Sequence, residues 1–378
     1  MEEVGVDDWL IDSLQLYSDL HVFELQDPTQ VIEWTSDKSI CVAGYKGTQS
    51  HEILELLLPQ KLSTKDNQGL CPERDFKVHH GGFSEEPISC LKYILGSKCV
   101  VTSGFPGSSL QIWRIGGDDT DAIKRTGCIN HNNKSEKSCK LASGVTGVAP
   151  RVLHGSQIRD VQLTDLESGR LLYTAGEDLS DIVSSLQFVD TDVFLVCTSS
   201  GDLWVGDIRD ASAFRRNPVG ELDGSYWCMD LRKDTLPSDP AVCTVVRLSS
   251  ASRAIVSDLR NLKSPICRAQ LNIPHGDAGC DFLNVTWAPA LDNCLAVSGF
   301  GGMVHIYDIT AWRPELTEPQ SLFVHKGHIM STGPESEFNP TIVTTHSWHP
   351  WRPRTLLSAG TDGSLHVWDW VDKTLNSC

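Results

Sequence analysis

The carboxyl-terminal stretch Thr355–Trp370, TLLSAGTDGSLHVWDW, contains two short β-rich runs separated by a Thr-Asp-Gly turn. Apolar residues that alternate in such runs predict two antiparallel strands joined by a tight turn, because successive side chains of a strand point to opposite faces. The pair Gly327-His328 stands about one repeat length before the closing pair Trp368-Asp369. The stretch therefore marks one unit of a repeat with a period of roughly 40 to 45 residues.

The same strand pattern recurs along the whole chain. Each copy has an apolar residue, any residue, an acidic residue and another apolar residue, although the second copy replaces the acid by arginine. The acidic position is occupied in turn by Glu55, Arg114, Asp165, Asp207, Asp258, Asp308 and Asp369. Repeats of this length form four-stranded blades around a central axis. The seven copies predict an all-β fold, a seven-bladed β-propeller of the WD40 type.

The amino-terminal strand LHVFEL (Leu20–Leu25) has no repeat of its own, whereas the last repeat lacks an outer strand because few residues follow Trp370. We therefore expect Leu20–Leu25 to supply that strand and to close the ring, which leaves no open edge between the first and last blades. Upstream, apolar residues at near-helical spacing in Trp9–Tyr17, behind Asp7 and Asp8, predict a short helix.

These features divide the chain into three parts. Residues 1–19 form an amino-terminal extension with the short helix, residues 20–372 form the propeller, and residues 373–378 form a tail. Within the propeller, three stretches rich in polar residues interrupt the repeat and are interpreted as loops. They cover residues 116–150, 211–224 and 312–340.

Composition favours a cytoplasmic protein that binds other proteins. The chain has 32 basic and 49 acidic residues, a net charge of −17, which argues against nonspecific binding to the nucleic-acid backbone. No apolar run approaches the roughly 18 residues of a membrane span, and the acidic start is unlike a secretory signal. The 13 cysteines show no zinc-pair spacing and predict free thiols in a reducing compartment.

Linear motifs for catalysis are missing from the sequence. It contains no phosphate-binding loop, no HExxH and no GxSxG elbow, so we expect no enzyme, no cofactor and no metal, although propellers can assemble sites from scattered loop residues. His346 and His349 are three residues apart in a predicted strand and should face opposite sides. His79-His80, followed by two glycines, predicts a strand end and a turn.

Four polar residues of the last repeat predict a buried hydrogen-bonded network. His328 precedes the inner strand, Ser358 lies in the second strand, Asp362 follows it in the turn, and Trp368 lies in the third strand. In WD40 blades such a set links indole, hydroxyl, imidazole and carboxylate. Buried polar groups are tolerated when each has a partner, so we expect a structural role rather than a catalytic one.

Longer strings of sequence carry a more specific resemblance. DDWLIDSL (Asp7–Leu14), VTSGFPGSSLQIW (Val101–Trp113) and VTWAPALDNCLAVSGFGGMVHIYD (Val285–Asp308), followed by the carboxyl-terminal stretch, closely resemble a vertebrate family of WD-repeat proteins. The resemblance extends from about Asp7 to Asp372. It implies a noncatalytic cytoplasmic assembly factor.

The resemblance also implies particular partners. Proteins of this family associate with Integrator complex subunits 9 and 11, the RNA endonuclease module, before nuclear import, and with the BRCA-associated ATM activator protein. A link to mitotic spindle poles and microtubules is attached to the same family. A cytoskeletal or mitotic adaptor is therefore the alternative to an assembly factor.

Two turns predict a partner-binding rim. Trp351, Arg352 and Arg354 lie in the turn between the first and second strands of the last blade, and Trp312-Arg313 lie in the turn between the third and fourth strands of the blade before it. Both turns belong to one face of a propeller, and tryptophan and arginine are enriched among interface hot spots. In the alternative interpretation the indoles fold back onto the blade edges and the arginines pair with acids such as Glu315.

Cys378, at the end of the tail, is a further candidate for partner contact. An exposed thiolate can bind zinc, and the resemblance implies a metal-dependent endonuclease as partner. The alternative is that the tail makes no contact with a partner or its metal.

Overall fold

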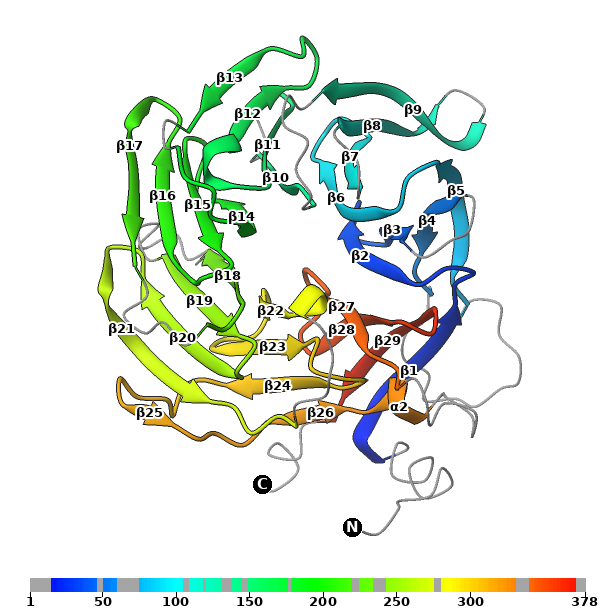
Figure 1. Ribbon diagram of the computed structural model, residues 1–378. Helices are drawn as coiled ribbons and strands as arrows, with labels where there is room; N and C mark the ends of the chain where they lie inside the picture. Colours follow the sequence, from blue (N-terminus) through cyan, green and yellow to red (C-terminus); the bar gives the residue numbers. More distant parts are fainter. Residues whose placement is uncertain are drawn as a thin grey trace.

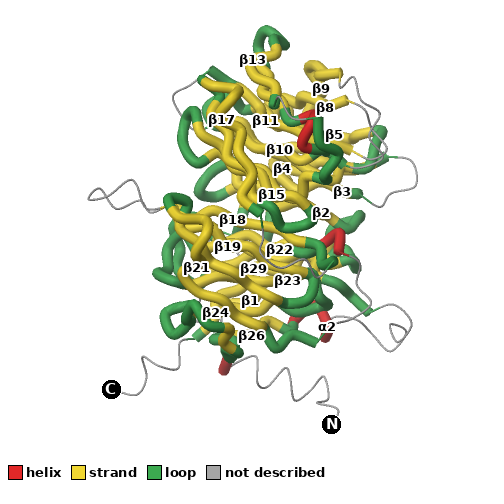
Figure 2. The backbone as a smooth tube through the Cα atoms, turned by 60° about the vertical axis from the view of Figure 1, so that its left-hand side comes forward, coloured by secondary structure: helices red, strands yellow, loops and turns green. Residues whose placement is uncertain are grey.

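Among the described residues β strands are by far the main secondary structure, as the sequence predicts (Figure 1). The computed structural model describes residues 15–45, 50–59, 75–104, 109–117, 120–130, 138–144, 149–175, 178–218, 224–233, 243–274, 280–330 and 340–371. The sheets stand around a central axis, which is consistent with a β-propeller, and helices appear only as short segments (Figure 2). No helix among the described residues is long and apolar enough to cross a bilayer.

The strands form antiparallel sets of four that follow one another along the chain. The first three sets are β2 (Thr29–Trp34), β3 (Ser39–Gly44), β4 (His51–Leu57) and β5 (Lys77–Ser84); β6 (Ile88–Ile94), β7 (Cys99–Gly104), β8 (Ser109–Gly117) and β9 (Thr120–Asn130); and β10 (Lys140–Ser143), β11 (Arg151–Gly155), β12 (Gln162–Asp165) and β13 (Leu171–Thr174).

Three further sets follow along the chain. They are β14 (Val183–Phe188), β15 (Val193–Thr198), β16 (Leu203–Asp207) and β17 (Asp210–Asn217); β18 (Trp227–Lys233), β19 (Cys243–Ser249), β20 (Arg253–Asp258) and β21 (Asn261–Gln270); and β22 (Asn284–Trp287), β23 (Cys294–Ser298), β24 (Val304–Asp308) and β26 (Phe323–His325). In the last of them the fourth strand is β26 rather than β25 (Leu316–Thr317). Short helical segments within the described ranges include η2 (Ile158–Asp160), η3 (Cys280–Phe282) and α2 (Gly327–Met330).

The last set combines the two ends of the chain. It contains β27 (Val343–Trp348), β28 (Thr355–Gly360), β29 (Ser364–Trp370) and the amino-terminal strand β1 (Tyr17–Glu24). β1 pairs antiparallel with β29, in a register that places Leu20 opposite Trp368 and Glu24 opposite Ser364. The predicted strand Leu20–Leu25 thus lies largely within β1, beside the last copy of the repeat.

Two parallel pairings connect outer strands. Gly81 of β5 bridges Ala122 of β9, which joins the first two sets into one eight-stranded sheet. The short β25 (Leu316–Thr317) adds to β21 as a fifth strand. At the first of these contacts a side chain on Gly82 would meet the backbone of Ile123 at 2.4 Å, so only glycine permits the two strands to approach this closely.

The core lies between neighbouring sheets. Ala296 of β23 and Ile306 of β24 pack with Trp348 of β27, Leu356 of β28 and Trp368 of β29 in a single buried cluster. Because neighbouring sheets cover both of their faces, β23 and β28 are buried at every residue rather than at alternate residues.

The recurring acid of the repeat has a local role in most copies. Asp207, Asp258 and Asp308 each accept a hydrogen bond from the backbone N–H two residues later, at 2.9, 2.8 and 2.8 Å. Asp165 accepts the corresponding bond from Ser168 at 2.8 Å. The carboxylate therefore caps the turn that follows the third strand, which explains why the acid recurs at this position.

Two predictions from the sequence, the loops and the extent of the amino-terminal helix, were wrong in detail. Residues 116–150, 211–224 and 312–340 are not simply loops, since they contain all of β9, β10, β25 and β26 and most of β17. Tyr17 does not belong to a helix: it begins β1, because its hydroxyl hydrogen-bonds His325 and its ring packs on Phe323. Gln15 and Leu16, directly before β1, are helical, and the rest of the predicted helix, through Leu14, lies outside the described residues.

Candidate partner-binding site

The four polar residues singled out in the last repeat lie close together in the structure. Trp368 Nε1 donates to Ser358 Oγ at 3.1 Å, and Ser358 Oγ is 2.8 Å from His328 Nε2. His328 Nδ1 is 2.8 Å from Ser364 Oγ, which donates to Asp362 Oδ1 at 2.7 Å. Because indole only donates and carboxylate only accepts, the bonds run in one direction, from Trp368 to Asp362. Ser364, which links the imidazole to the carboxylate, was not predicted from the sequence.

Two more histidines extend this buried region toward β1. His366 stacks on His328 with ring centroids 3.8 Å apart, and its Nδ1 lies 3.1 Å from His325 Nε2. His325 Nδ1 is 2.8 Å from the Tyr17 hydroxyl. Burial raises the pKa of Tyr17 far above its usual value, so the phenol keeps its proton and can donate it to His325. Strand β1 is thereby bonded to β26 of the neighbouring sheet.

Replacing His328 with alanine should lower the free energy of unfolding by about 1 to 3 kcal/mol, because Ser358 and Ser364 lose a buried partner. Denaturant unfolding measures this loss. Partner capture by the folded variant should match that of the unchanged chain. Loss of capture without loss of stability would instead make His328 a contact residue.

Trp312 does not lie on an exposed rim, so its prediction as a partner contact was wrong. Its side chain is only 7% exposed and packs against Tyr307 with ring centroids 6.1 Å apart. The turn folds back because the backbone N–H of Trp312 donates to the carbonyl of Ile309 at 2.9 Å. Arg313 remains exposed, while its own carbonyl accepts a hydrogen bond from Arg268.

Trp351 is the exposed aromatic residue of the predicted rim. Its side chain is 63% exposed, next to the exposed Arg352 and the half-buried Arg354. The turn is held by His349, whose Nδ1 accepts from the N–H groups of Trp351 and Arg352 at 3.2 and 3.0 Å. His349 is itself fixed against Trp34, at 4.8 Å between ring centroids. The indole therefore stands on an ordered turn.

Charged groups flank this turn. A hollow of about 280 Å³ is lined by Arg352, Pro353, Asp19 and Asp369, among others. Burial raises the pKa of Asp369 to about 6, and Asp19 adds to this effect, while the facing Arg354 and Arg352 oppose it. Trp351, Arg352 and Arg354 are called the tryptophan–arginine rim below.

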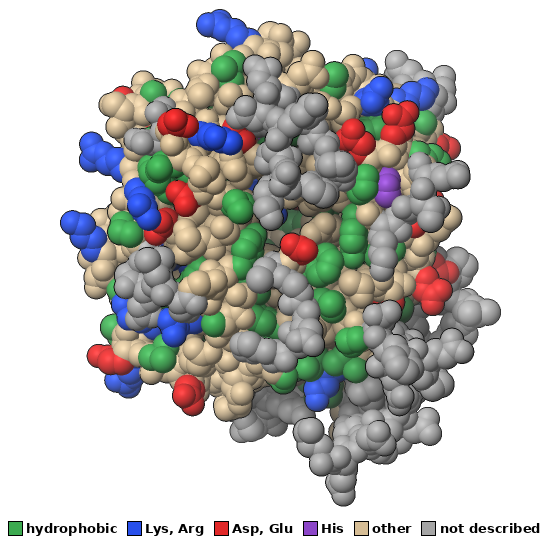
Figure 3. All heavy atoms as spheres, in the orientation of Figure 1, with side chains coloured by type: hydrophobic (Ala, Val, Ile, Leu, Met, Phe, Trp, Pro, Cys, Tyr) green, Lys and Arg blue, Asp and Glu red, His purple; other side chains and the backbone are tan. Residues whose placement is uncertain are grey.

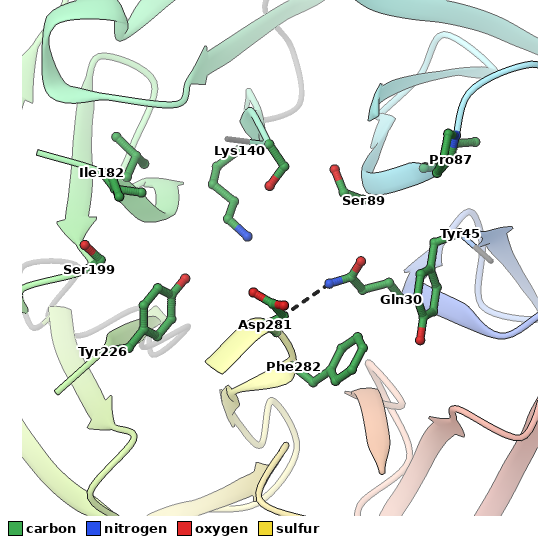
Figure 4. A pocket seen from close by; sticks show the side chains of 13 residues that line it. Gln30, Tyr45, Pro87, Ser89, Lys140, Ile182, Ser199, Tyr226, Asp281 and Phe282 are labelled. Carbon is green, nitrogen blue, oxygen red and sulfur yellow. Dashed lines mark hydrogen bonds between the residues drawn. The ribbon is translucent and has the colours of Figure 1, made fainter. Parts of the chain in front are cut away.

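A second candidate surface lies at the central axis, on the face that carries the turns between second and third strands. A cavity of about 620 Å³ is lined there by residues from many sheets, including Tyr45, Lys140, Tyr226 and Phe282 (Figure 4). Gln30 Nε2 donates to the Asp281 carbonyl across it at 3.3 Å. Hydrophobic side chains gather around the centre of this face, and most basic side chains lie toward its periphery (Figure 3).

This cavity was not predicted from the sequence. Its lining residues are spread from Gln30 to Phe282, and no linear spacing relates them. Consecutive turns of an antiparallel sheet alternate between its two ends, so the cavity and the tryptophan–arginine rim lie on opposite faces. Cys378 lies outside the described residues.

The repeated strands and the network from indole to carboxylate define the class: this chain is a WD-repeat protein. No family model matches it. An Integrator complex assembly factor WDR73 of Danio rerio is 55% identical over 367 residues, covering 97% of each chain. Its Xenopus laevis counterpart is 45% identical over 366 residues, 96% of this chain and 98% of that one. The Homo sapiens counterpart is 43% identical over 374 residues, 97% and 98% of the two chains.

Identity of this level over nearly the full length of both chains shows common descent. The chain belongs to the WDR73 family.

Proposed function

We propose that this chain is a noncatalytic assembly factor for the Integrator complex. The main support is that relatives 42 to 55% identical over nearly their whole length are named Integrator complex assembly factor WDR73. The structure offers surfaces for protein contact, namely the tryptophan–arginine rim and the axial cavity. The partners are proteins, with no direct contact to nucleic acid or membrane.

In finer terms, the chain stabilises or masks Integrator complex subunits 9 and 11 in the cytoplasm before nuclear import, and it also associates with the BRCA-associated ATM activator protein. The resemblance of the sequence to the family supports these partners. The net charge of −17 supports a protein surface rather than an RNA as the direct ligand.

The architecture behind this role is a seven-bladed propeller closed by β1. Each copy of the repeated pattern falls on the third strand of a different antiparallel set, and β1 pairs with β29 of the last set. A closed ring presents rigid turns at fixed positions, and this suits a scaffold for other proteins.

Changing Trp351 to alanine and Arg352 to glutamate should reduce capture of subunits 9 and 11 at least tenfold, a loss of about 1.4 kcal/mol. The double variant removes the exposed ring and reverses the adjacent charge, and it leaves the buried core unchanged. Pull-down of the two subunits from cytosol at several bait concentrations measures the loss.

A matched control changes Arg170 to glutamate and Leu172 to alanine, which alters an exposed cation and an exposed apolar residue elsewhere. The control should capture normally. Equal capture by the Trp351 and Arg352 variant with native melting would exclude the rim, and Lys140→Glu would then test the axial cavity. If the chain recovers tubulin or spindle-pole proteins without Integrator subunits, the cytoskeletal adaptor replaces the assembly factor.

A further inference from the structure

A β-bulge interrupts the pairing of β4 with β5. Glu55 lies opposite His80, but the next residue, Leu56, lies opposite Val78, so His79 is the extra residue of β5. In a regular strand, adjacent side chains point to opposite faces; a bulge changes this direction locally. Figure 1 shows β4 and β5 together at the outer side of the first strand set.

The bulge brings two adjacent imidazoles to one carboxylate oxygen. The ring centroids of His79 and His80 are 3.9 Å apart. Glu55 Oε2 is 2.6 Å from His80 Nδ1 and 3.3 Å from His79 Nδ1. The sequence predicted a strand end and a turn at these histidines, whereas they lie in the middle of β5.

Neighbouring groups hold this arrangement in place. Thr35 Oγ1 donates to Glu55 Oε1 at 2.8 Å, which turns the other carboxylate oxygen toward the imidazoles. Gly116, with φ of 64°, faces His80: a side chain there would approach Nε2 to 2.7 Å. Unlike the aspartates that cap their turns in four other repeats, Glu55 uses its longer side chain to reach Thr35 and the two histidines.

We propose that Glu55 Oε2, His79 Nδ1 and His80 Nδ1 form a zinc site. The three ligand atoms lie within 4.8 Å of one another. Tetrahedral Zn²⁺ with bonds of about 2.0 to 2.1 Å separates its ligand atoms by about 3.3 Å, the distance between His79 and Glu55. The shorter contact between His80 and Glu55 opens by about 0.7 Å as the metal replaces the shared proton.

Access to solvent differs among the three ligands. The side chain of His79 is 50% exposed, while that of Glu55 is 10% exposed. Two histidines, one carboxylate and an open fourth position match the ligand set of zinc sites that keep a water or accept an outside ligand. Because His79 is half exposed, solvent and a donor atom of a partner protein can reach the site and take the fourth position.

A second histidine cluster in the chain does not offer such a site. His325, His328 and His366 also lie within 4.8 Å, but both ring nitrogens of His328 are bonded to serines. His325 is bonded to Tyr17 and to His366. Metal binding there would break several buried hydrogen bonds, whereas at Glu55 it replaces only the hydrogen bond between Glu55 and His80.

The test uses the full chain, stripped with a chelator and dialysed against Zn²⁺ or Co²⁺. We expect one tightly bound ion per chain and a rise in melting temperature with zinc, because the ion binds only the folded site. Cobalt should give the visible absorption of a tetrahedral site without the intense near-ultraviolet bands of thiolate ligation. That distinction separates this site from the free cysteines.

Single variants His79→Gln and His80→Gln should each weaken zinc binding at least tenfold. His79 is half exposed, so His79→Gln should keep the melting temperature of the metal-free chain. The control His21→Gln changes a partly exposed histidine of β1 and should bind zinc normally. Unchanged zinc affinity in both site variants, a cobalt spectrum of thiolates alone, or no bound zinc would overturn the proposal.

Discussion

A chain that begins at Gln26 should melt at a temperature lower by about 10 °C or more than the full chain, and should aggregate. The deletion removes β1, which pairs with β29 from Tyr17 opposite Trp370 to Glu24 opposite Ser364. It also removes the backbone bond from Leu25 to Gly363. Without β1, the backbone of β29 becomes an unpaired sheet edge.

Side chains increase the effect of this deletion. Tyr17 packs in the cluster of Trp368 and Trp370, and its hydroxyl bonds His325. Backbone bonds worth about 1 kcal/mol each, together with the lost apolar contacts, amount to a loss on the order of 5 kcal/mol. Differential scanning fluorimetry and light scattering measure the melting temperature and the aggregation.

A shorter deletion provides the control. Removing residues 1–14 leaves β1 intact and should leave the melting temperature close to that of the full chain. Tyr17→Phe isolates the hydroxyl and should cost about 1 kcal/mol. If the chain from Gln26 melts and remains soluble like the full chain, β1 does not close the structure.

The third strand of each set was predictable, while most outer strands were not. The third strand carries the apolar pattern and a capping acid, so β16 and β24 stand out in the sequence. Outer strands have fewer neighbours and are more exposed. The sequence of β17, DASAFRRN, therefore shows no regular alternation and was interpreted as a loop.

Among the candidate surface residues, too, some positions could be predicted from the sequence and others could not. The sequence does not distinguish Trp351 from Trp312, because tryptophan is common both in buried cores and at protein interfaces. Only the fold of the turn decides that Trp312 packs under Tyr307 while Trp351 faces solvent. The bulge at His79 also could not be predicted from the sequence, because it depends on the pairing of β5 with β4 rather than on β5 alone.

Acid should destabilise the folded chain steeply between pH 6.5 and pH 5. Burial lowers the pKa of six histidines in or beside the last two sheets of the chain, because a charged imidazole loses its hydration there. The pKa falls to about 4 for His305, His349 and His366 and to about 3 for His346, and it lies well below its usual value for His325 and His328.

The sign of the effect follows from proton uptake. An unfolded histidine titrates near pH 6.5, so below this pH the unfolded chain binds protons that the folded chain excludes. Stability present above pH 6.5 is therefore lost as the pH falls toward the lower pKa of the folded state. Each histidine with a folded pKa of about 4 costs about 2 kcal/mol at pH 5.

Three partly buried carboxyls act in the opposite direction. Burial raises the pKa of Asp369 to about 6 and also raises the pKa of Asp230 and Glu52. Each folded carboxyl takes up a proton before its unfolded counterpart does, so its protonation stabilises the fold as the pH falls. The six histidines outnumber these three groups, and the net change remains a loss.

His305→Gln separates this mechanism from general acid unfolding. His305 Nε2 has no hydrogen-bond partner among the described residues, and its ring lies beside Tyr307 at 6.3 Å between centroids. Glutamine does not titrate, so between pH 7 and pH 5 the variant should lose about 2 kcal/mol less stability than the unchanged chain. Urea unfolding at both pH values measures the two losses. Equal losses in the two chains would show that His305 is not among the groups through which acid unfolds the protein.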